Sequence, residues 1–397
     1  MATTNGTTPT PSTTDVDVLI IGAGFSGIST IYRTRKLGLK ALILESGSDF
    51  GGVWYHNRYP GARVDSEWPY YQLNIPEVYR TFSFSERFPG HAELRKYMAH
   101  LDKVLELRKD CIFNAHVNDC SWDEKSGRWT VKTQQGHVAT AKYLTLCTGL
   151  LHRRHYPEFP GLENFKGAVH HSGFWPEDLS TEGKKVALIG AGATAVQITQ
   201  EVAKDADQLT IFMRRPSYCL PMMQRKLNEL ENRGFQAYYD ILFREGRKSM
   251  AGFPSNRSQK SALEGTPEER EAVMEDLWTR GGFQFMFAFA DTTVNKEANK
   301  VVYDFWQRKV AARMRPGKKR DLMAPPVDKM PYWFATKRAP LEQDYYECVD
   351  RDNVDVVDMN EQRIKNFADG GIVFEDGTEK EFDILILATG FDSFSGS

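Results

Sequence analysis

Two glycine-rich segments of the chain have the spacing of loops that bind the phosphate groups of a dinucleotide. The first contains Gly22, Gly24 and Gly27, and the second contains Gly190 and Gly192, with alanine at its third position. Such glycines allow a tight turn and a close approach of the backbone to pyrophosphate, and the N-terminus of the following helix offers free N–H groups. We therefore expect two dinucleotide sites, the first of which also includes Phe25 and Ser26.

The end of the strand that follows each loop distinguishes the two nucleotides. Glu45 lies about 20 residues after the first loop, where a carboxylate accepts hydrogen bonds from ribose hydroxyls and repels a 2′-phosphate. Arg214 and Arg215 occupy the matching position of the second unit, where guanidinium groups favour a 2′-phosphate. Charge-assisted bonds contribute roughly 1.5–3 kcal/mol each, which corresponds to a preference of about ten- to a hundredfold for NADPH over NADH. A solvated surface pair is the alternative interpretation of the two arginines.

The presence of two loops in one chain bears on the identity of the first nucleotide. NAD is one possibility for the first site. Hydride transfer from nicotinamide to flavin, however, explains why a single chain would hold two dinucleotides. We therefore expect FAD at the first loop and NADPH at the second.

The elements that must position these loops recur in the same order in both halves. Apolar runs typical of buried strands, at 16–21 and 186–189, lead into the loops, and a helical stretch and a second apolar strand follow each of them. A hairpin and an apolar strand ending in Thr-Gly complete each unit, over 129–149 and 372–390. The sequence therefore predicts an α/β protein with two Rossmann-like dinucleotide-binding domains.

Changes in composition set the expected domain boundaries. The Thr/Ser/Pro-rich residues 1–14 are interpreted as a disordered tail, and residues 15–155 as the FAD-binding domain. Residues 156–335 are expected to form the NADP-binding domain, interrupted at about 222–320 by solvated, charged helices to which we assign no chemistry. Residues 336–397 are expected to return to the FAD-binding domain, which is incomplete at its C-terminus.

Composition argues against several other classes of protein. The 397 residues are 41% hydrophobic and 26% charged, and the net charge of −2 gives no attraction to nucleic acid or anionic membranes. No membrane-spanning apolar run and no signal peptide are evident, so we expect a cytoplasmic protein without a membrane partner. The five cysteines are scattered and form no C-x-x-C pair, so neither a metal site nor a disulfide reductase is expected. A monomer is the expectation for its assembly.

Two longer motifs carry a family resemblance. Gly51-Gly-Val-Trp-Tyr-His-Asn-Arg-Tyr-Pro-Gly-Ala-Arg-Val-Asp65 follows the first unit, and Phe165-Lys-Gly-Ala-Val-His-His-Ser-Gly-Phe-Trp-Pro176 precedes the second loop. Both match the signatures of Baeyer–Villiger monooxygenases position by position, although Glu177 stands where Asp or His is usual. From about residue 15 to its last residue, the chain resembles this family of flavoproteins.

The resemblance implies a reaction and a catalytic arginine. NADPH would reduce FAD, oxygen would form a C4a-peroxyflavin, and a ketone would become an ester or lactone plus water. Lys337-Arg338 and the following Asp344-Tyr-Tyr-Glu347 match the segment that carries the family's arginine. Arg338 is therefore expected to stabilise the negatively charged adduct, with Asp65 positioning it at the flavin edge. The ketone itself is not indicated.

Further contacts are implied by matched position. Gly52, Val53, Trp54, Tyr71 and Val117 are expected to contact FAD; Arg63 and Val64 to lie beside the nicotinamide; and Ala193, Thr194, Ala195, Val196, Gln197 and Lys337 to contact NADP. His171 and Trp175 are expected to have a structural or hinge role between the domains.

Two other functions stay open at this point. A heteroatom-oxidising flavin monooxygenase shares the two loops, but such relatives lack the Asp65 and Arg338 pair. A nucleotide-binding remnant without activity is the other, because family members continue beyond Ser397 with a helix that faces the flavin and loops that cover the substrate. We accordingly expect the chain as given to hold FAD weakly and to oxygenate ketones poorly.

Overall fold

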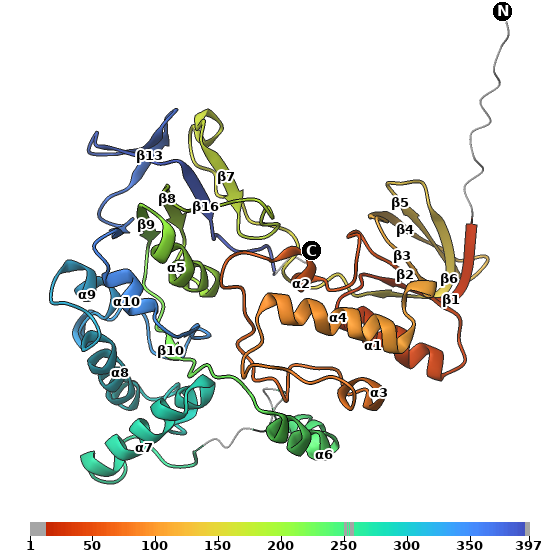
Figure 1. Cartoon of the computed structure of the whole chain (residues 1–397), viewed down its shortest axis with the longest axis horizontal. Coiled ribbons are helices and arrows are strands. Elements are labelled where there is room, and N and C mark those ends of the chain that lie inside the picture. Colours follow the sequence, from red (N-terminus) through yellow and green to blue (C-terminus); the bar gives the residue numbers. More distant parts are fainter. Residues whose placement is uncertain (1–12, 250–251, 253, 255–257, 394–397) are drawn as a thin grey trace, which may run out of the picture.

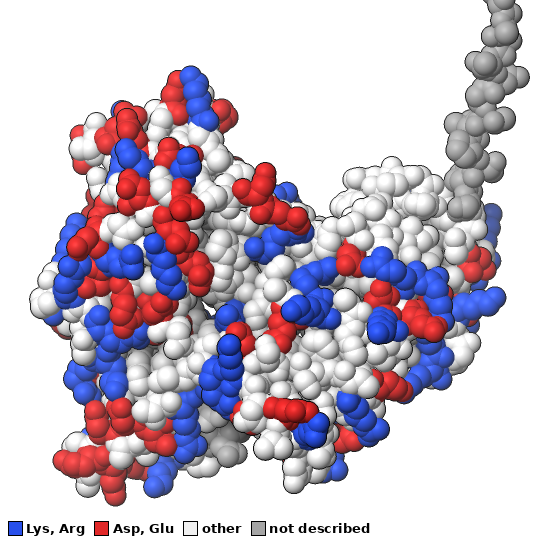
Figure 2. Space-filling model, viewed as in Figure 1, with Lys and Arg blue, Asp and Glu red and all other residues white. Residues whose placement is uncertain are grey.

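The two predicted nucleotide units form two lobes, each built around its own sheet (Figure 1). The computed structural model describes residues 13–249, 252, 254 and 258–393. In each lobe a parallel β-α-β unit carries a glycine loop between its first strand and its helix, as predicted. Acidic and basic side chains are mixed over both lobes on the face shown in Figure 2. Within the described ranges, no helix combines the length and the apolar character needed to cross a membrane.

The first lobe contains a six-stranded sheet in the order β3-β2-β1-β6-β5-β4. Its strands are β1 (Thr13–Ile21), β2 (Ala41–Leu44), β3 (Cys111–Ile112), β4 (Val117–Asp123), β5 (Arg128–Thr133) and β6 (Val138–Leu146). Alternate residues of β1 face two different cores: Val18 and Ile20 share one with helix α1 (Phe25–Lys36), whereas Leu19 and Ile21 share the other with the β5-β6 hairpin. Helices α2 (Val53–His56), α3 (Pro76–Tyr79) and α4 (His91–Leu105) complete the lobe.

The first strand begins earlier than the sequence suggested. Thr13 and Thr14 pair with Val138 and Ala139 of β6, so these two residues do not belong to the expected disordered tail. The strand extends because the partner strand is long enough to satisfy its backbone groups. The rest of the expected tail, residues 1–12, lies outside the described residues.

The second lobe contains a five-stranded parallel sheet in the order β12-β9-β8-β16-β7. Its strands are β7 (Ala168–His171), β8 (Lys185–Ile189), β9 (Gln208–Met213), β12 (Val354–Asp358) and β16 (Ile384–Leu387), and helix α5 (Ala193–Asp205) joins β8 to β9. Because β12 pairs with β9 and β16 lies between β7 and β8, the expected return of 336–397 to the first domain is wrong for these strands. The fully apolar β16 needs neighbours on both sides, and the second sheet provides them.

The predicted Asp-Gly hairpin of the second unit is present as part of a separate small sheet. Strands β13 (Ile364–Phe367), β14 (Gly371–Phe374) and β15 (Glu379–Glu381) pair antiparallel in that order. Gly377 supplies the positive φ of 83° that the turn requires. In the first lobe β6 serves both the hairpin and the main sheet, whereas here β15 and β16 divide these two tasks.

The expected helical insertion is present but is less solvated than predicted. It contains α6 (Glu229–Gly246), α7 (Pro267–Arg280), a 3₁₀ segment (Gly282–Phe287), α8 (Lys296–Ala311) and α9 (Lys318–Met323). Capping boxes at Asn228 and Thr266 start α6 and α7. Helix α8 buries Tyr303, Phe305 and Trp306 completely, so its charged residues cover only its outer side.

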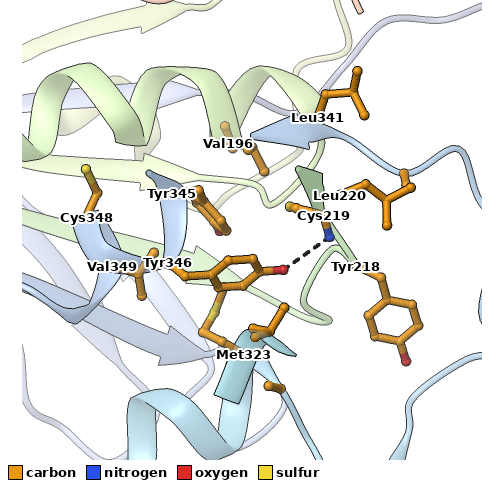
Figure 3. Packing of buried hydrophobic residues seen from close by; sticks show 14 of the residues in the cluster. Val196, Tyr218, Cys219, Leu220, Met323, Leu341, Tyr345, Tyr346, Cys348 and Val349 are labelled. Atoms are coloured by element: carbon orange, nitrogen blue, oxygen red, sulfur yellow. Dashed lines mark hydrogen bonds between the residues drawn. The ribbon is translucent and has the colours of Figure 1, made fainter. Parts of the chain in front are cut away.

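The insertion and the second sheet share a core. Figure 3 shows Tyr345 and Tyr346 of α10 (Tyr345–Asp350) packed among side chains of α5, of α9 and of the strands β10 (Leu220–Pro221) and β11 (Leu341–Glu342). The hydroxyl of Tyr346 accepts a hydrogen bond from the Cys219 N–H at 3.2 Å. This core fixes the segment between Arg338 and β12 on the second lobe.

Candidate functional site

The first glycine loop has the close backbone approaches that its sequence predicts. Gly22 has a φ of 104°, and a Cβ there would lie 2.5 Å from the Cys147 carbonyl oxygen. A Cβ on Gly27 would overlap the Gly22 carbonyl. The first intrahelical N–H of α1 is that of Ile28, which donates to Gly24 at 3.0 Å, so the N–H groups of Phe25, Ser26 and Gly27 face out of the helix end. This end offers the donors that a pyrophosphate requires.

Gly52 faces Gly24 across the loop, and aromatic side chains flank it. A Cβ on Gly52 would lie 3.0 Å from the Gly24 Cα, so a side chain at either residue would fill the cradle. The indole N–H of Trp54 donates to the Tyr71 hydroxyl at 2.8 Å, and the Tyr71 ring meets Phe25 edge-on at 5.3 Å. Burial raises the pKa of Tyr71 to about 12, so its hydroxyl stays neutral. These residues fit a flat, uncharged ring system beside the loop. Val53 lies next to Trp54 in the short helix α2.

Glu45 has a structural role in addition to the one expected. Its carboxylate is buried and accepts hydrogen bonds from the N–H groups of Ala23 and Gly47, each at 2.6 Å. It therefore holds the loop in shape, and its remaining acceptor positions are the ones available to a ribose. Val117, another expected FAD contact, begins β4. Two residues before it, the N–H of Ala115 donates to the Glu45 carbonyl at 2.8 Å, so this part of the chain is tied to Glu45.

The second glycine loop has the same design as the first. Gly190 has a φ of 129°, where a Cβ would overlap the Ala388 carbonyl. Gly192 and Ala193 are exposed, whereas Ala195 and Val196 are buried in the core of the second lobe. The Val196 N–H already donates to Gly192 at 3.0 Å. The N–H groups of Ala193, Thr194 and Ala195 are therefore the ones at this helix end that can face a phosphate, and the NADP contacts expected of Val196 and Gln197 stay a prediction.

Three cations gather near the end of β9. Arg214 and Arg215 are exposed directly after the strand, and Asn360 fixes the Arg214 carbonyl at 2.6 Å. The Lys337 ammonium lies 4.5 Å from the Tyr332 ring centre, and the hydroxyl of that ring donates to the Pro216 carbonyl at 2.9 Å. In the part of the chain that the structure describes, none of these three cations forms an ion pair, so their charge is available to an anion.

A contact between the lobes that the sequence did not reveal joins the first signature to helix α5. The Tyr59 hydroxyl donates to the Gln197 side chain at 2.9 Å, and the amide of Gln197 donates to the Arg63 carbonyl at 2.9 Å. A Cβ on Gly61, which has a φ of 77°, would lie 2.6 Å from the Gln197 carbonyl. Gln197 therefore connects the lobes, a role that no local pattern could have indicated.

The two residues expected beside the nicotinamide are held by contacts within the first lobe. The Arg63 guanidinium pairs with Glu86 and donates to the Phe88 carbonyl at 2.6 Å. Val64 is buried in the core of the first lobe. Their place beside a nicotinamide stays a prediction.

Asp65 and Arg338, which are 273 positions apart in the sequence, meet in a bidentate ion pair. Nε and Nη2 of Arg338 donate to the two carboxylate oxygens of Asp65 at 2.9 and 2.6 Å. The arginine side chain is 64% exposed, whereas that of Asp65 is 29% exposed. A cavity of about 110 Å³ opens beside the pair and is lined partly by Asp65, Phe88 and Phe283. Phe283 comes from the insertion, which therefore contributes to the site although we assigned it no chemistry.

The second signature forms the connection between the lobes. Nδ1 of His171 accepts from the Gly173 N–H and Nε2 donates to the Gly390 carbonyl, each at 3.0 Å. Glu177, the departure from the family pattern, pairs with Arg58 of the first signature. Trp175 is buried with the second-lobe core. These contacts fit the structural role that we predicted for His171 and Trp175. Within the described ranges, no group of three or more His, Cys, Asp or Glu side chains could hold a metal ion.

The buried His171 predicts a dependence of stability on pH. Burial lowers its pKa from 6.5 to about 4, so the unfolded chain takes up a proton between these values while the folded protein does not. Stability is thus lost as the pH falls through this window, by about 3 kcal/mol for this group. The free energy of unfolding, measured with urea at pH 7 and pH 4, should therefore fall by about 3 kcal/mol less in His171→Gln than in wild type. Exposed His116→Gln is the control, and equal pH slopes for all three proteins would contradict the assignment.

Known proteins resemble the chain over nearly its whole length. A family model described as flavin-binding monooxygenase-like matches residues 15–243. FAD-binding monooxygenase acrE of Aspergillus aculeatus is 45% identical, over 96% of this chain and 64% of its own length. Cyclopentanone 1,2-monooxygenase of Comamonas sp. is 39% identical, over 96% of this chain and 69% of its own. A structure of oxidised steroid monooxygenase bound to NADP superposes with a TM-score of 0.89 at 36% identity, covering 96% of this chain and 72% of that one.

The chain thus spans about two thirds of the length of these relatives. The match includes both glycine loops, both signatures and the arginine segment, and the identity to several relatives exceeds what a shared fold alone would explain. On this evidence the chain belongs to the flavin-binding monooxygenase-like family.

Proposed function

We propose that this protein is a Baeyer–Villiger monooxygenase that binds FAD and NADPH and uses O2 to convert ketones into esters or lactones. The bidentate pair of Asp65 and Arg338 carries this proposal, because it places a permanent cation beside a cavity at the first signature. The similarity of the chain to a cyclopentanone monooxygenase supports a ketone as the substrate.

The residues around the two loops fit the two dinucleotides. Free N–H groups at the start of α1, the Gly24–Gly52 cradle and Glu45 suit FAD. The start of α5 and the cations Arg214, Arg215 and Lys337 suit NADPH, whose 2′-phosphate needs such partners. When bound and reduced, the flavin supplies the activation of oxygen that side chains cannot provide.

The protein's own contribution is electrostatic. Inserting an oxygen atom next to a ketone carbonyl puts negative charge on the carbonyl oxygen, and a guanidinium stabilises this charge without losing its proton at any ordinary pH. Asp65 occupies one edge of the guanidinium, so the opposite edge with Nη1 is left to face a ligand. Asp65 thereby orients the cation.

Isotope labelling tests the function. The protein is mixed with FAD, NADPH, ¹⁸O2 and cyclopentanone, and the products are analysed by mass spectrometry. A lactone with one labelled oxygen, formed slowly and with FAD in excess, is the expected result. NADPH oxidation that gives only peroxide, or oxidation of a thioether without any lactone, would overturn the proposal, and a protein that binds no flavin would be a nucleotide-binding remnant.

Arg214→Ala tests the second nucleotide site separately. Removing one charge-assisted contact to the 2′-phosphate should weaken NADP⁺ binding by about ten- to a hundredfold. NAD⁺ lacks this phosphate, so its affinity should stay the same. Titration calorimetry with both nucleotides measures the difference, and an equal loss for both would remove Arg214 from the phosphate site.

A further inference from the structure

The Arg338 guanidinium is held on one edge and on one face. Asp65 takes the edge formed by Nε and Nη2, and the ring of Phe283 lies 4.5 Å from the guanidinium carbon. Within the described part of the chain, Nη1 donates no hydrogen bond. The guanidinium therefore has one edge and one face fixed, and its remaining edge is open.

The turn before Phe283 is built to place this ring. Gly281 and Gly282 have φ angles of 69° and 74°, and a Cβ on Gly281 would lie 2.7 Å from the Met223 side chain. Arg87 of the first lobe donates to the Arg280 carbonyl at 2.8 Å and to Glu67 at 2.9 Å. The Arg87 side chain is only 13% exposed, so little water competes for its hydrogen bond to Arg280, which joins the first lobe to the insertion. The position of Phe283 thus follows from a specific backbone turn and an anchored ion pair.

We propose that Phe283 is a positioning residue that holds the Arg338 guanidinium against Asp65, next to the cavity that Asp65 and Phe283 line. The inference rests on the proposed function for its catalytic meaning. The Arg338 side chain is long and 64% exposed, so without this ring the Asp65 pair alone would restrain it and the guanidinium would visit more rotamers. A cation–π contact at such an exposed site changes this distribution by about two- to fivefold.

Nuclear magnetic resonance of the protein without added cofactors tests the contact itself. Arginine labelled with ¹⁵N at Nε gives one signal for each arginine, and Arg338→Lys identifies the signal of this residue by its loss. A ring over the guanidinium shifts the Nε–H proton upfield. The signal should move downfield in Phe283→Leu and stay in place in Phe283→Tyr, which retains the ring. An unchanged signal in Phe283→Leu would overturn the proposal.

Product partition tests the consequence for catalysis. Phe283→Leu should lower the rate of lactone formation by about two- to fivefold, raise peroxide release and leave the KM for NADPH unchanged. Phe283→Tyr should restore the wild-type ratio. Phe285→Leu is the matched control, because its ring packs against Trp278 and Phe305 inside the insertion and should affect only the melting temperature.

The two experiments distinguish a failure of the positioning role of Phe283 from a failure of the proposed function on which it rests. A wild-type protein that forms no lactone contradicts the proposed function, whereas the resonance of Arg338 still decides whether Phe283 holds it. A lactone-to-peroxide ratio that is the same in wild type and Phe283→Leu would overturn the positioning role even if the resonance moves.

Discussion

Arg338→Ala is expected to lower lactone formation by about a hundred- to a thousandfold relative to wild type while FAD is retained to the same extent, which is the usual range for removing one electrostatic stabiliser of a developing oxyanion. The side chain lies at the edge of the first lobe and does not contribute to the glycine-loop cradle. Its removal should therefore leave the flavin spectrum unchanged. NADPH oxidation should continue and release peroxide in place of the lactone.

Two further variants distinguish charge from geometry at this position. Arg338→Lys keeps the charge but loses the planar fork that binds both oxygens of Asp65, so it should recover only part of the activity. Asp65→Asn keeps the cation but loosens its orientation, and it should reduce lactone formation less than Arg338→Ala. Gas chromatography of the lactone and a coupled peroxide assay measure both products. Lactone formation at the wild-type rate in Arg338→Ala would exclude this residue from the mechanism.

Local patterns explain why so much of the fold could be predicted. The buried strands, the glycine loops and the Asp376–Gly377 turn each depend on neighbours within a few residues, and all of them are present in the structure. The repeat also implied that 372–390 completes the second unit. We nevertheless assigned 336–397 to the first domain, because sequence order alone does not show which sheet a late strand joins.

The site required information that local patterns do not contain. Asp65 and Arg338 are 273 positions apart, and only the family resemblance connected them. Nothing in the sequence indicated that Gln197 would contact Tyr59 or that Phe283 would cover the arginine. In each case the partner comes from the other lobe or from the insertion, so its position depends on how the lobes pack.

Arg313→Ala is expected to destabilise the protein by about 3–5 kcal/mol, the usual result of leaving one member of a buried ion pair alone. Nη1 and Nη2 of Arg313 donate to the two oxygens of Glu342 at 2.6 and 3.0 Å, and Glu342 is only 1% exposed. Arg313 also donates to Glu347 through Nε at 2.7 Å. Urea unfolding measures the loss of stability.

Arg308 provides the matched control because it has the same side chain and also bridges two carboxylates. It lies on α8, five positions before Arg313, and pairs with Glu271 and Asp304, but both partners are about half exposed. Water screens these pairs, so Arg308→Ala should change the free energy of unfolding by less than about 1 kcal/mol. Equal losses for the two arginines would contradict the buried pair.

A double variant identifies the origin of the loss. If an uncompensated Glu342 carboxylate causes it, Arg313→Met combined with Glu342→Leu should recover most of the stability, because the buried charge is removed together with its partner. The ion pair would then serve mainly to fix the register of the segment that begins at Arg338, four residues before Glu342. In that case the double variant should unfold at nearly the wild-type urea concentration and still release more peroxide per NADPH, since Arg338 is less firmly placed.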